Sequence, residues 1–517
     1  MNPYLSSKRN SIVLVSFLSL AFWANPKFSQ NKSDIFSSDK NFQTKQLTIS
    51  SYVPAKKREP NHDLFAVDDE LDAIIDNFDS DHPLNLKSNF ISVVGDDGKL
   101  LVLYSPKKTF EYSYVLKFSK TLTLEKEIKV KRLYPHVGGF TKGDDGEYYI
   151  LYGRQSREIQ NLKSCVKLVK YSSEFQVKSE LDIDTSKDGY DVLAPFNSGN
   201  SRILFANGKI GIHFAKIQFR NDDGLNHQAS LFLQVDAKSW EVDSGASTNL
   251  LASHSFAQHL IHDGEDFVTL DMGDWNPRAL CVSKNLQRRN IFTYTAPGGK
   301  FYMVENRTFT DVGGIVSSGD SYIVTGIADD DTTRLKKVSR IHDRLFALKI
   351  AKDFVNISQT SEDGEPYRIR NDLVISEGET SEIFEYEDRN GEIRKQQNVG
   401  VKWFTPSEKT ALNPKIIKIH DDRFGILYLD SFPSTNYITY FEIDSNLQIT
   451  KKEKRIGEVR FKVNQNTSSL GDRLDHEKLW DQNEYVFFNG NIIWFQQILE
   501  YQLVETKSIQ MNVLKVE

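Results

Sequence analysis

The stretch that decides the fold is HSFAQHLIHDGEDFVTLDMGDWNPRALCV, residues His254–Val282. Two apolar runs flank the turn signal Asp263-Gly264, whose residues tolerate the positive φ angles of a tight hairpin. The second run ends at the polar cluster Gly273–Arg278, and a third apolar run follows it. Because a polar cluster with Gly and Pro interrupts a strand, the stretch predicts three strands joined by one tight turn and one polar loop.

The same design recurs along the chain. Seven segments consist of an apolar run, a turn of Gly, Asp or Asn, and a second apolar run. They begin at Phe90, Gly138, Ser201, Gln258, Gly313, Lys415 and Glu484. One or two further strand-like runs follow each segment, so four strands recur roughly every 50 to 60 residues. This period predicts an all-β fold, a β-propeller of four-stranded blades. We favour seven blades, with six or eight as alternatives, and a pair of β-sandwiches is the main rival fold.

The segments outside the repeat predict export. A basic pair, Lys8 and Arg9, precedes the apolar run Ser11–Ala24, which is the pattern of a secretory signal peptide within residues 1–30. Cleavage after Ala24 or near Gln30 fits the pattern, and an uncleaved anchor is the alternative. We expect residues 31–86 to be a linker or strap, and residues 87–517 to form the propeller with an inserted β-hairpin arm at about 358–412.

The charge and composition of the chain limit the kinds of partner that we expect. The formal net charge is −6 and the pI is near 6.1, which argues against a nucleic-acid footprint. No other run is apolar enough to span a membrane. Because the N-terminal pattern is that of a secretory signal, the mature chain is expected in the periplasm or outside the cell. The two cysteines, Cys165 and Cys281, fall on equivalent strands of non-adjacent repeats, so we expect no disulfide between them. A monomer is expected.

The chain resembles a group of uncharacterised secreted bacterial β-propeller proteins over roughly residues 88 to 500. The resemblance rests on short motifs. They are Ser253-His254-Ser255-Phe256 with Gln258, Gly273-Asp274, Pro277-Arg278, Gly313-Gly314, Asn413-Pro414-Lys415 and Asn226-His227-Gln228. The resemblance implies the fold and export, and it implies no activity because none is assigned to the group.

Propeller topology predicts which face carries a site. The tight Asp-Gly hairpins lie on one face, while the loops between second and third strands and between blades lie on the other. Polar residues collect in the second set of loops, where rigid scaffolds usually carry function. The candidate ligand-binding residues on this rim are Arg202, His227, His254, Gln258, Asp274, Arg278 and Asn413. The alternative for Asp274–Arg278 is a purely structural turn, with an Asx hydrogen bond and a Pro at a strand start.

We expect no metal, no cofactor and no assigned catalytic residue. His254, His259 and His262 invite a zinc site, but on an extended strand His254 and His262 would lie well over ~20 Å apart at roughly 3.3 Å per residue, so they could share a zinc ion only if the chain folded back. A calcium ion at Asp329–Asp331 is the alternative to a solvated acidic loop, although the run lacks the spacing of a helical calcium loop. The chain contains no Gly-x-Ser-x-Gly, His-Glu-x-x-His or phosphate-binding loop motif.

Three functions fit these observations. The first is an exported, non-enzymatic binding or scaffold protein that uses the rim for a polar ligand or a protein partner. The second is an extracellular polymer-acting enzyme, glycosidase-like or lyase-like. It predicts two carboxylates, or a carboxylate and a His, with perturbed pKa values in the channel. The third is a purely structural envelope protein, whose channel would be filled by apolar or self-paired side chains.

Overall fold

The computed structural model describes the following ranges: 34–37, 39–51, 90–106, 111–154, 164–197, 199–222, 224–273, 279–293, 311–328, 344–353, 383–387, 393–397, 401–406, 409–431, 435–460, 484–500 and 504–517. The predicted signal peptide lies outside these residues. Among the helices described, none is long and apolar enough to cross a membrane.

The described chain forms a seven-bladed β-propeller in which each blade is an antiparallel sheet built on four strands. Blades 1 and 2 comprise β3 (Phe90–Val94), β4 (Leu100–Tyr104), β5 (Tyr112–Phe118), β6 (Leu124–Lys131), β7 (His136–Lys142), β8 (Tyr148–Gly153), β9 (Val166–Tyr171) and β10 (Val177–Ile183). Blade 3 comprises β11 (Ala194–Pro195), β12 (Ser201–Ala206), β13 (Lys209–Ile217), β14 (Gln228–Asp236), β15 (Glu241–Val242) and β16 (Thr248–Ser253). A 3-10 turn, η1 (Ser244–Ala246), separates β15 from β16.

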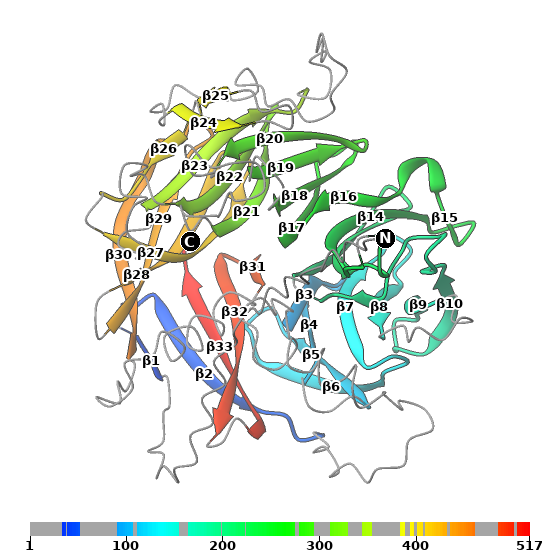
Figure 1. The fold of residues 1–517 in the computed structure, drawn as a ribbon. Helices are drawn as coiled ribbons and strands as arrows, with labels where there is room; N and C mark the ends of the chain where they lie inside the picture. The colour runs from blue at the N-terminus through cyan, green and yellow to red at the C-terminus, as the bar shows by residue number, and fades with distance from the viewer. Residues whose placement is uncertain are drawn as a thin grey trace, which may run out of the picture. The chain divides into compact units, whose positions relative to one another are not determined.

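Blade 4 comprises β17 (Ser255–His262), β18 (Phe267–Gly273), β19 (Ala279–Lys284) and β20 (Gln287–Thr293), and blade 5 comprises β21 (Asp311–Ser318), β22 (Ser321–Ala328), β23 (Arg344–Ala351) and β26 (Val401–Trp403). Blade 6 comprises β27 (Thr410–His420), β28 (Arg423–Ser431), β29 (Thr435–Ile443) and β30 (Ile449–Arg460), and blade 7 begins with β31 (Tyr485–Phe488), β32 (Asn491–Glu500) and β33 (Val504–Lys515). The first strand of each blade lies nearest the centre (Figure 1). The favoured number of blades is therefore confirmed.

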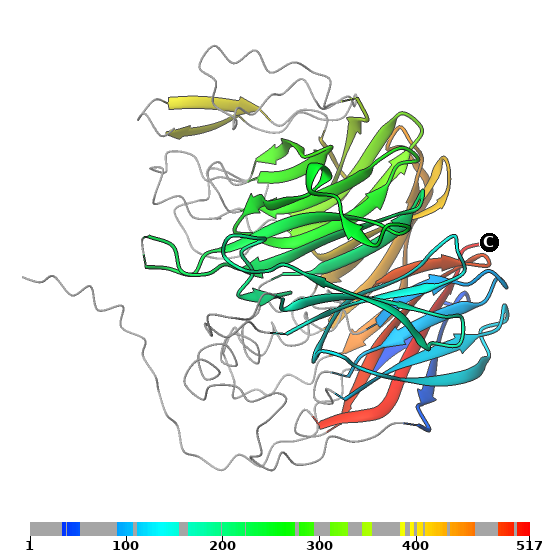
Figure 2. The same ribbon diagram turned by 90° about the vertical axis from the view of Figure 1, so that its right-hand side faces the viewer.

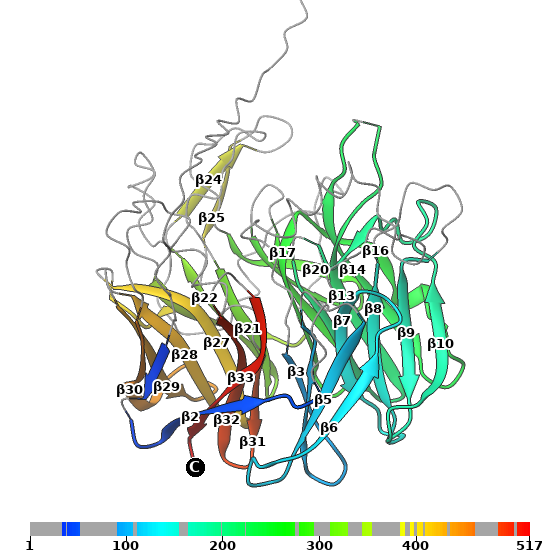
Figure 3. The same ribbon diagram turned by 90° about the horizontal axis from the view of Figure 1, so that it is seen from below.

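The N-terminal strands complete the last two blades. The fourth strand of blade 7 is β2 (Phe42–Thr48), which pairs antiparallel with β33, and Figures 1 and 3 show it in blue beside the red strand. A shorter strand, β1 (Asp34–Ser37), adds to the edge of blade 6 by pairing with β30. These two strands belong to the propeller rather than to the linker expected across residues 31–86. The chain thus closes the ring by hydrogen-bonding its beginning to its end.

Two further strands form a separate hairpin. Strands β24 (Ile383–Glu387) and β25 (Ile393–Gln397) pair only with each other among the described strands. They lie between the third and fourth strands of blade 5 in the sequence. Figure 2 shows this hairpin, in yellow, apart from the blades.

The tight turns between first and second strands use two conformations. In Asn207-Gly208 and Asn489-Gly490 both residues have positive φ, as a two-residue type I′ turn requires. After Asp97, Asp145 and Asp263, only the following glycine has positive φ, and in the first two turns its N–H donates to a carbonyl three residues earlier. The Asn-Gly pairs therefore form tight two-residue turns, whereas the Asp-Gly pairs lie in longer loops.

Four of the seven innermost strands contain a β-bulge. The pairing register shifts between Val137 and Gly139, Ser255 and Gln258, Val312 and Gly314, and Leu412 and Lys415. Several bulged residues have no room for a side chain. A Cβ atom at Gly138 would lie 2.3 Å from the Phe196 ring, and one at Gly313 would lie 2.7 Å from the Pro414 carbonyl oxygen. Bulges twist a strand and re-aim its residues, so here they let adjacent blades approach closely around the axis.

Apolar clusters fill the spaces between blades. The smallest cluster in the described chain joins blades 3 and 4 through Phe232, Leu251 and Phe267, whereas the cluster between blades 4 and 5 has 16 buried members. A buried polar network supplements the smaller one. The Ser255 hydroxyl donates to Asp271 Oδ1 at 2.6 Å, and His213 Nε2 lies 3.2 Å from Asp271 Oδ2. The motif that contains Ser255 and Gln258 therefore helps to connect blades 3 and 4 through buried hydrogen bonds.

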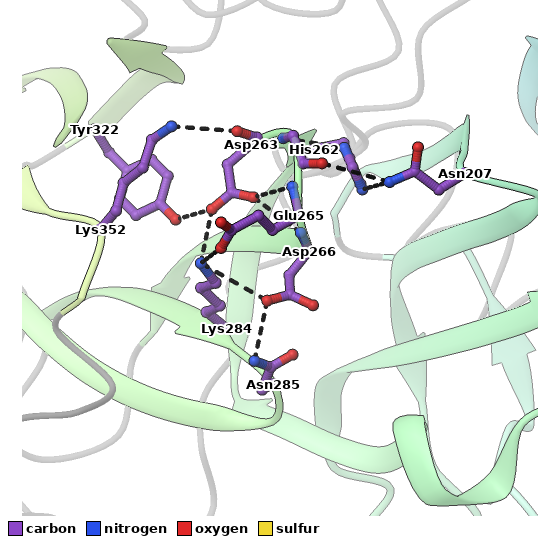
Figure 4. A network of polar contacts seen from close by, with 10 residues as sticks. Asn207, His262, Asp263, Glu265, Asp266, Lys284, Asn285, Tyr322 and Lys352 are labelled. Carbon is purple, nitrogen blue, oxygen red and sulfur yellow. Dashed lines mark hydrogen bonds and ion pairs between the residues drawn. The ribbon is translucent and has the colours of Figure 1, made fainter. Parts of the chain in front are cut away.

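On the hairpin face, Asp263 joins blades 4 and 5 (Figure 4). One carboxylate oxygen, Oδ2, accepts hydrogen bonds from Lys284 Nζ at 2.9 Å and Tyr322 Oη at 2.5 Å. The backbone oxygen of Asp263 accepts a bond from Lys352 Nζ at 3.2 Å. Burial alone would raise the pKa of the Asp263 carboxyl, but the backbone N–H of Asp266, Lys284 and the other donors lower it well below its usual value.

Candidate functional site

A cavity of about 290 Å³ lies on the propeller axis. Its walls come from the innermost strand of every blade: β3, β7, β12, β17, β21, β27 and the start of β31. Much of the wall is apolar, with Ile91, Phe140 and Ile315 among its residues. The volume is close to the lower end of the range for small-molecule sites, roughly 300 Å³.

Four ionisable groups stand out in this wall: Arg202, His259, Lys415 and Glu484. Arg202 Nη1 lies 3.3 Å from Glu484 Oε1, and their side chains are 18% and 23% exposed. Arg202 belongs to blade 3, whereas Glu484 directly precedes the first strand of blade 7. These blades are not neighbours in the ring, so the ion pair crosses the channel instead of joining two adjacent blades.

The cavity shifts the pKa values of its acid and its base. Burial raises the pKa of the Glu484 carboxyl, and Arg202 and the Ser92 backbone N–H offset only part of that effect. Burial also lowers the pKa of His259 well below its usual value, and the positive charges of Arg202 and Lys415 lower it further. The imidazole is therefore neutral near pH 7, while the carboxyl holds its proton to a higher pH than an ordinary Glu.

Two hydroxyl groups of the wall have no hydrogen-bond partner among the described residues. They are Ser92 Oγ and Ser201 Oγ, and Ser201 is only 7% exposed. Buried hydroxyls normally find a partner, because leaving one unsatisfied costs about 1–3 kcal/mol. Ser201 directly precedes Arg202 on β12, and the Ser92 backbone N–H donates to Glu484, so both residues stand beside the ion pair.

Of the candidate rim residues, Arg202 lines the cavity. Gln258 and Asn413 are buried at the bulges of β17 and β27. The Gln258 amide donates to Ser255 at 2.7 Å and accepts from the Asn200 N–H at 2.6 Å, so both ends of it are occupied within the protein. Asn413 has φ of +52°, a left-handed conformation that Asn tolerates better than most residues.

His227 and His254 are brought together between blades 3 and 4. Their ring centroids lie 5.6 Å apart, edge to face. His254 forms the turn between β16 and β17 with φ of +50°, and its N–H donates to the Gln228 carbonyl at 2.9 Å. Its Nδ1 lies 2.7 Å from Ser253 Oγ. The remaining candidates, Asp274 and Arg278, and the acidic run Asp329–Asp331 lie outside the described residues.

Sequence reasoning did not select His259, Lys415 or Glu484 as ligand-binding residues. The sequence does contain a pattern that indicates these three residues, because each lies on or beside a segment predicted to be the first strand of a blade. A propeller channel is lined by such strands, and an ionisable residue among apolar ones there is costly to bury. Aligning the seven first strands by their facing residues would have placed these three with Arg202.

Three other chemistry-bearing residues of the described chain, Asp271, Cys165 and Cys281, do not line this cavity. Asp271 stands between Ser255 and His213, all three fully buried, whereas a nucleophilic triad places the His in the middle. Cys165 and Cys281 are buried and not disulfide-bonded, as expected, and burial raises their pKa values to about 12 and about 11. Within the described ranges, no group of three or more His, Cys, Asp or Glu is placed to hold a metal ion.

No protein-family model matches the chain, and no curated protein matches it. Solved structures match its fold. A protein of unknown function from Dyadobacter fermentans has a TM-score of 0.35 and 9% identity, covering 72% of this chain and 94% of its own. Polysaccharide lyase Uly1 has a TM-score of 0.40 and 7% identity, covering 94% and 100%. A PL25 ulvan lyase has a TM-score of 0.42 and 10% identity, covering 82% and 94%. Such low identities concern the fold alone, and no activity is carried over from them.

Proposed function

We propose that this chain is an exported binding protein that takes a small polar ligand into its axial cavity. The observation that carries the proposal is a channel of about 290 Å³ in which Arg202, His259, Lys415 and Glu484 converge from four blades. Ionisable groups in a confined wall cost desolvation free energy, which a polar ligand can offset by binding them. Export rests on the sequence pattern Lys8–Ala24 alone.

A structural role explains less of the cavity. It accounts for the Arg202–Glu484 pair, because a structural channel is expected to contain self-paired side chains. It does not account for the open volume of the channel, or for the Ser92 and Ser201 hydroxyls that have no partner among the described residues. The other form of the binding proposal is a protein partner on the face where His227 and His254 lie.

Acid–base catalysis in the same cavity is the second candidate function. The enzyme hypothesis expects a carboxylate and a His with perturbed pKa values in the channel. Glu484 has a raised pKa and His259 a lowered one, which suits a proton donor and a proton acceptor. Such an enzyme would act by proton transfer between these two groups and the ligand. Product formation from a bound ligand would favour this candidate over simple binding.

The binding proposal is tested by thermal unfolding of the mature chain against a panel of neutral sugars, small carboxylates, sulfate, phosphate and short peptides. A cavity ligand at 100 times its dissociation constant should stabilise the chain by about 2.7 kcal/mol. Replacing Lys415 by Gln should reduce this stabilisation, because Lys415 lines the cavity. The matched control is Lys418→Gln on the same strand, whose side chain is 40% exposed and pairs with Asp421. The proposal fails if no compound stabilises the chain, or if both variants bind like the native protein.

A further inference from the structure

We propose that the ligand of the axial cavity is an oxyanion, a carboxylate, sulfate or phosphate group, and that Glu484 is the internal counter-ion which it displaces. The inference rests on the binding function proposed above. It adds the chemical class of the ligand, and it predicts that one proton accompanies binding.

The charge of the cavity favours an anion. Among the described lining residues, Arg202 and Lys415 are cations and Glu484 is the only carboxylate. His259 is neutral, because burial and the two cations lower its pKa. The lining residues from β3, β7 and β21 carry no ionisable side chain, and Tyr485 contributes a phenol. The described wall therefore carries two cations and one acid, and it gains a further unit of positive charge when that acid is protonated.

The contacts of Glu484 are those that an oxyanion would make. Its Oε1 lies 3.3 Å from a guanidinium nitrogen of Arg202, and the Ser92 backbone N–H donates to its carboxylate. A guanidinium has five N–H donors in a planar fork, which suits a carboxylate, sulfate or phosphate. The Ser92 and Ser201 hydroxyls lack a partner among the described residues, and both residues line the same cavity. The channel therefore presents groups that can bind an oxyanion. In the unliganded protein the Glu484 carboxylate is paired with Arg202.

Displacement couples binding to a proton. A bound oxyanion beside Glu484 repels the carboxylate, so binding raises its pKa above the already raised value of the unliganded protein. The bound form therefore holds a proton that the unliganded form releases, and affinity falls as pH rises through the window between these two pKa values. His259 adds positive charge only at lower pH. Arg202 from β12 is the charged group beside Glu484, and the other titratable groups of the described cavity wall are His259 from β17, Lys415 from β27 and Tyr485.

The experiment is isothermal titration of the mature chain with sulfate, and separately with glucuronate, from pH 5 to pH 8. Each pH is measured in two buffers of different ionisation enthalpy, which yields the number of protons taken up without any variant. We expect proton uptake that approaches one, and an affinity that falls by up to about tenfold per pH unit. Glu484→Gln should bind sulfate at least about tenfold more tightly at pH 8 and with no pH dependence, since nothing then competes for Arg202. The control Glu174→Gln, whose side chain is 72% exposed, should match the native chain.

Three results overturn the inference. If the native chain binds both anions without taking up a proton, the proposed coupling between binding and protonation of Glu484 is refuted. Equal affinity of native protein and a folded Glu484→Gln variant for sulfate removes the displacement. Tight binding of neutral sugars but of neither anion leaves the binding function standing and refutes the oxyanion. By contrast, the absence of binding by every compound in every buffer refutes the binding function itself.

Discussion

At the scale of single residues, buried charges hold blades together where they are surrounded by donors. The Asp263 side chain is only 1% exposed, and Lys284 beside it is 7% exposed. The bond from Tyr322 extends this contact to blade 5. A buried charge contributes to stability only when its partners are complete, and removing one partner leaves the other unsatisfied.

Replacing Asp263 by Asn should destabilise the chain by about 2 kcal/mol at pH 7, because bonds to a charged group are worth about 1.5–3 kcal/mol. The pKa of Asp263 is lowered by folding. Its contribution is therefore complete above the pKa of the unfolded state, about 3.9, and is lost as pH falls through the lower folded value. Urea unfolding at several pH values measures both effects. The variant and the native chain should converge in strong acid, and Asp266→Asn, at a 37% exposed carboxylate, should change little at any pH.

At the scale of elements, the bulged first strands determine how closely blades approach. Gly138 and Gly153 both face the Phe196 ring, which is fully buried and has φ of +61°. The ring therefore fills a space that exists only because these two positions lack side chains. Gly138 lies at the bulge of β7, where the pairing register shifts between Val137 and Gly139. The same glycine therefore accommodates both the bulge and the close contact with Phe196.

Replacing Gly138 by Ala should destabilise the chain by about 1–3 kcal/mol, the usual cost of forcing extra volume into a packed core. The new methyl group would lie 2.3 Å from the Phe196 ring. Gly273→Ala is the matched control, since the nearest atom its Cβ would meet among the described residues lies 3.5 Å away. Equal urea midpoints for the two variants would show that the Phe196 ring moves aside without cost.

At the scale of the whole molecule, closure of the ring joins the two ends of the chain. Phe42 on β2 is buried, and its ring stacks on Trp494 of β32 with centroids 5.4 Å apart. Leu47 and Ile49 belong to the cluster between blades 7 and 1. Without β2, the edge of β33 would expose unpaired backbone groups and these apolar contacts would be lost.

A chain that starts at Ser51 should therefore unfold at a lower urea concentration than one that starts at Ser38. The loss of the Phe42 side chain alone should cost about 3–5 kcal/mol. The exposed edge of β33 should also cause association, which sedimentation would detect. If both truncated chains unfold at the same midpoint and remain monomeric, β2 is dispensable and closure relies on the remaining strands of blade 7.

The sequence by itself determined the repeat. Turn residues with positive φ and alternating apolar runs are local signals, so Asn207-Gly208 and Asn489-Gly490 already implied hairpins, and their recurrence implied seven blades. Only the tertiary structure decided that Phe42–Thr48 is the last strand of blade 7 and that Arg202 meets Glu484 across the axis. Both depend on closure of the ring, which brings together residues that no local pattern relates. The alternation of residues along a strand predicts which side chains share a face. Which residues of other blades contact that face is decided only when the ring closes.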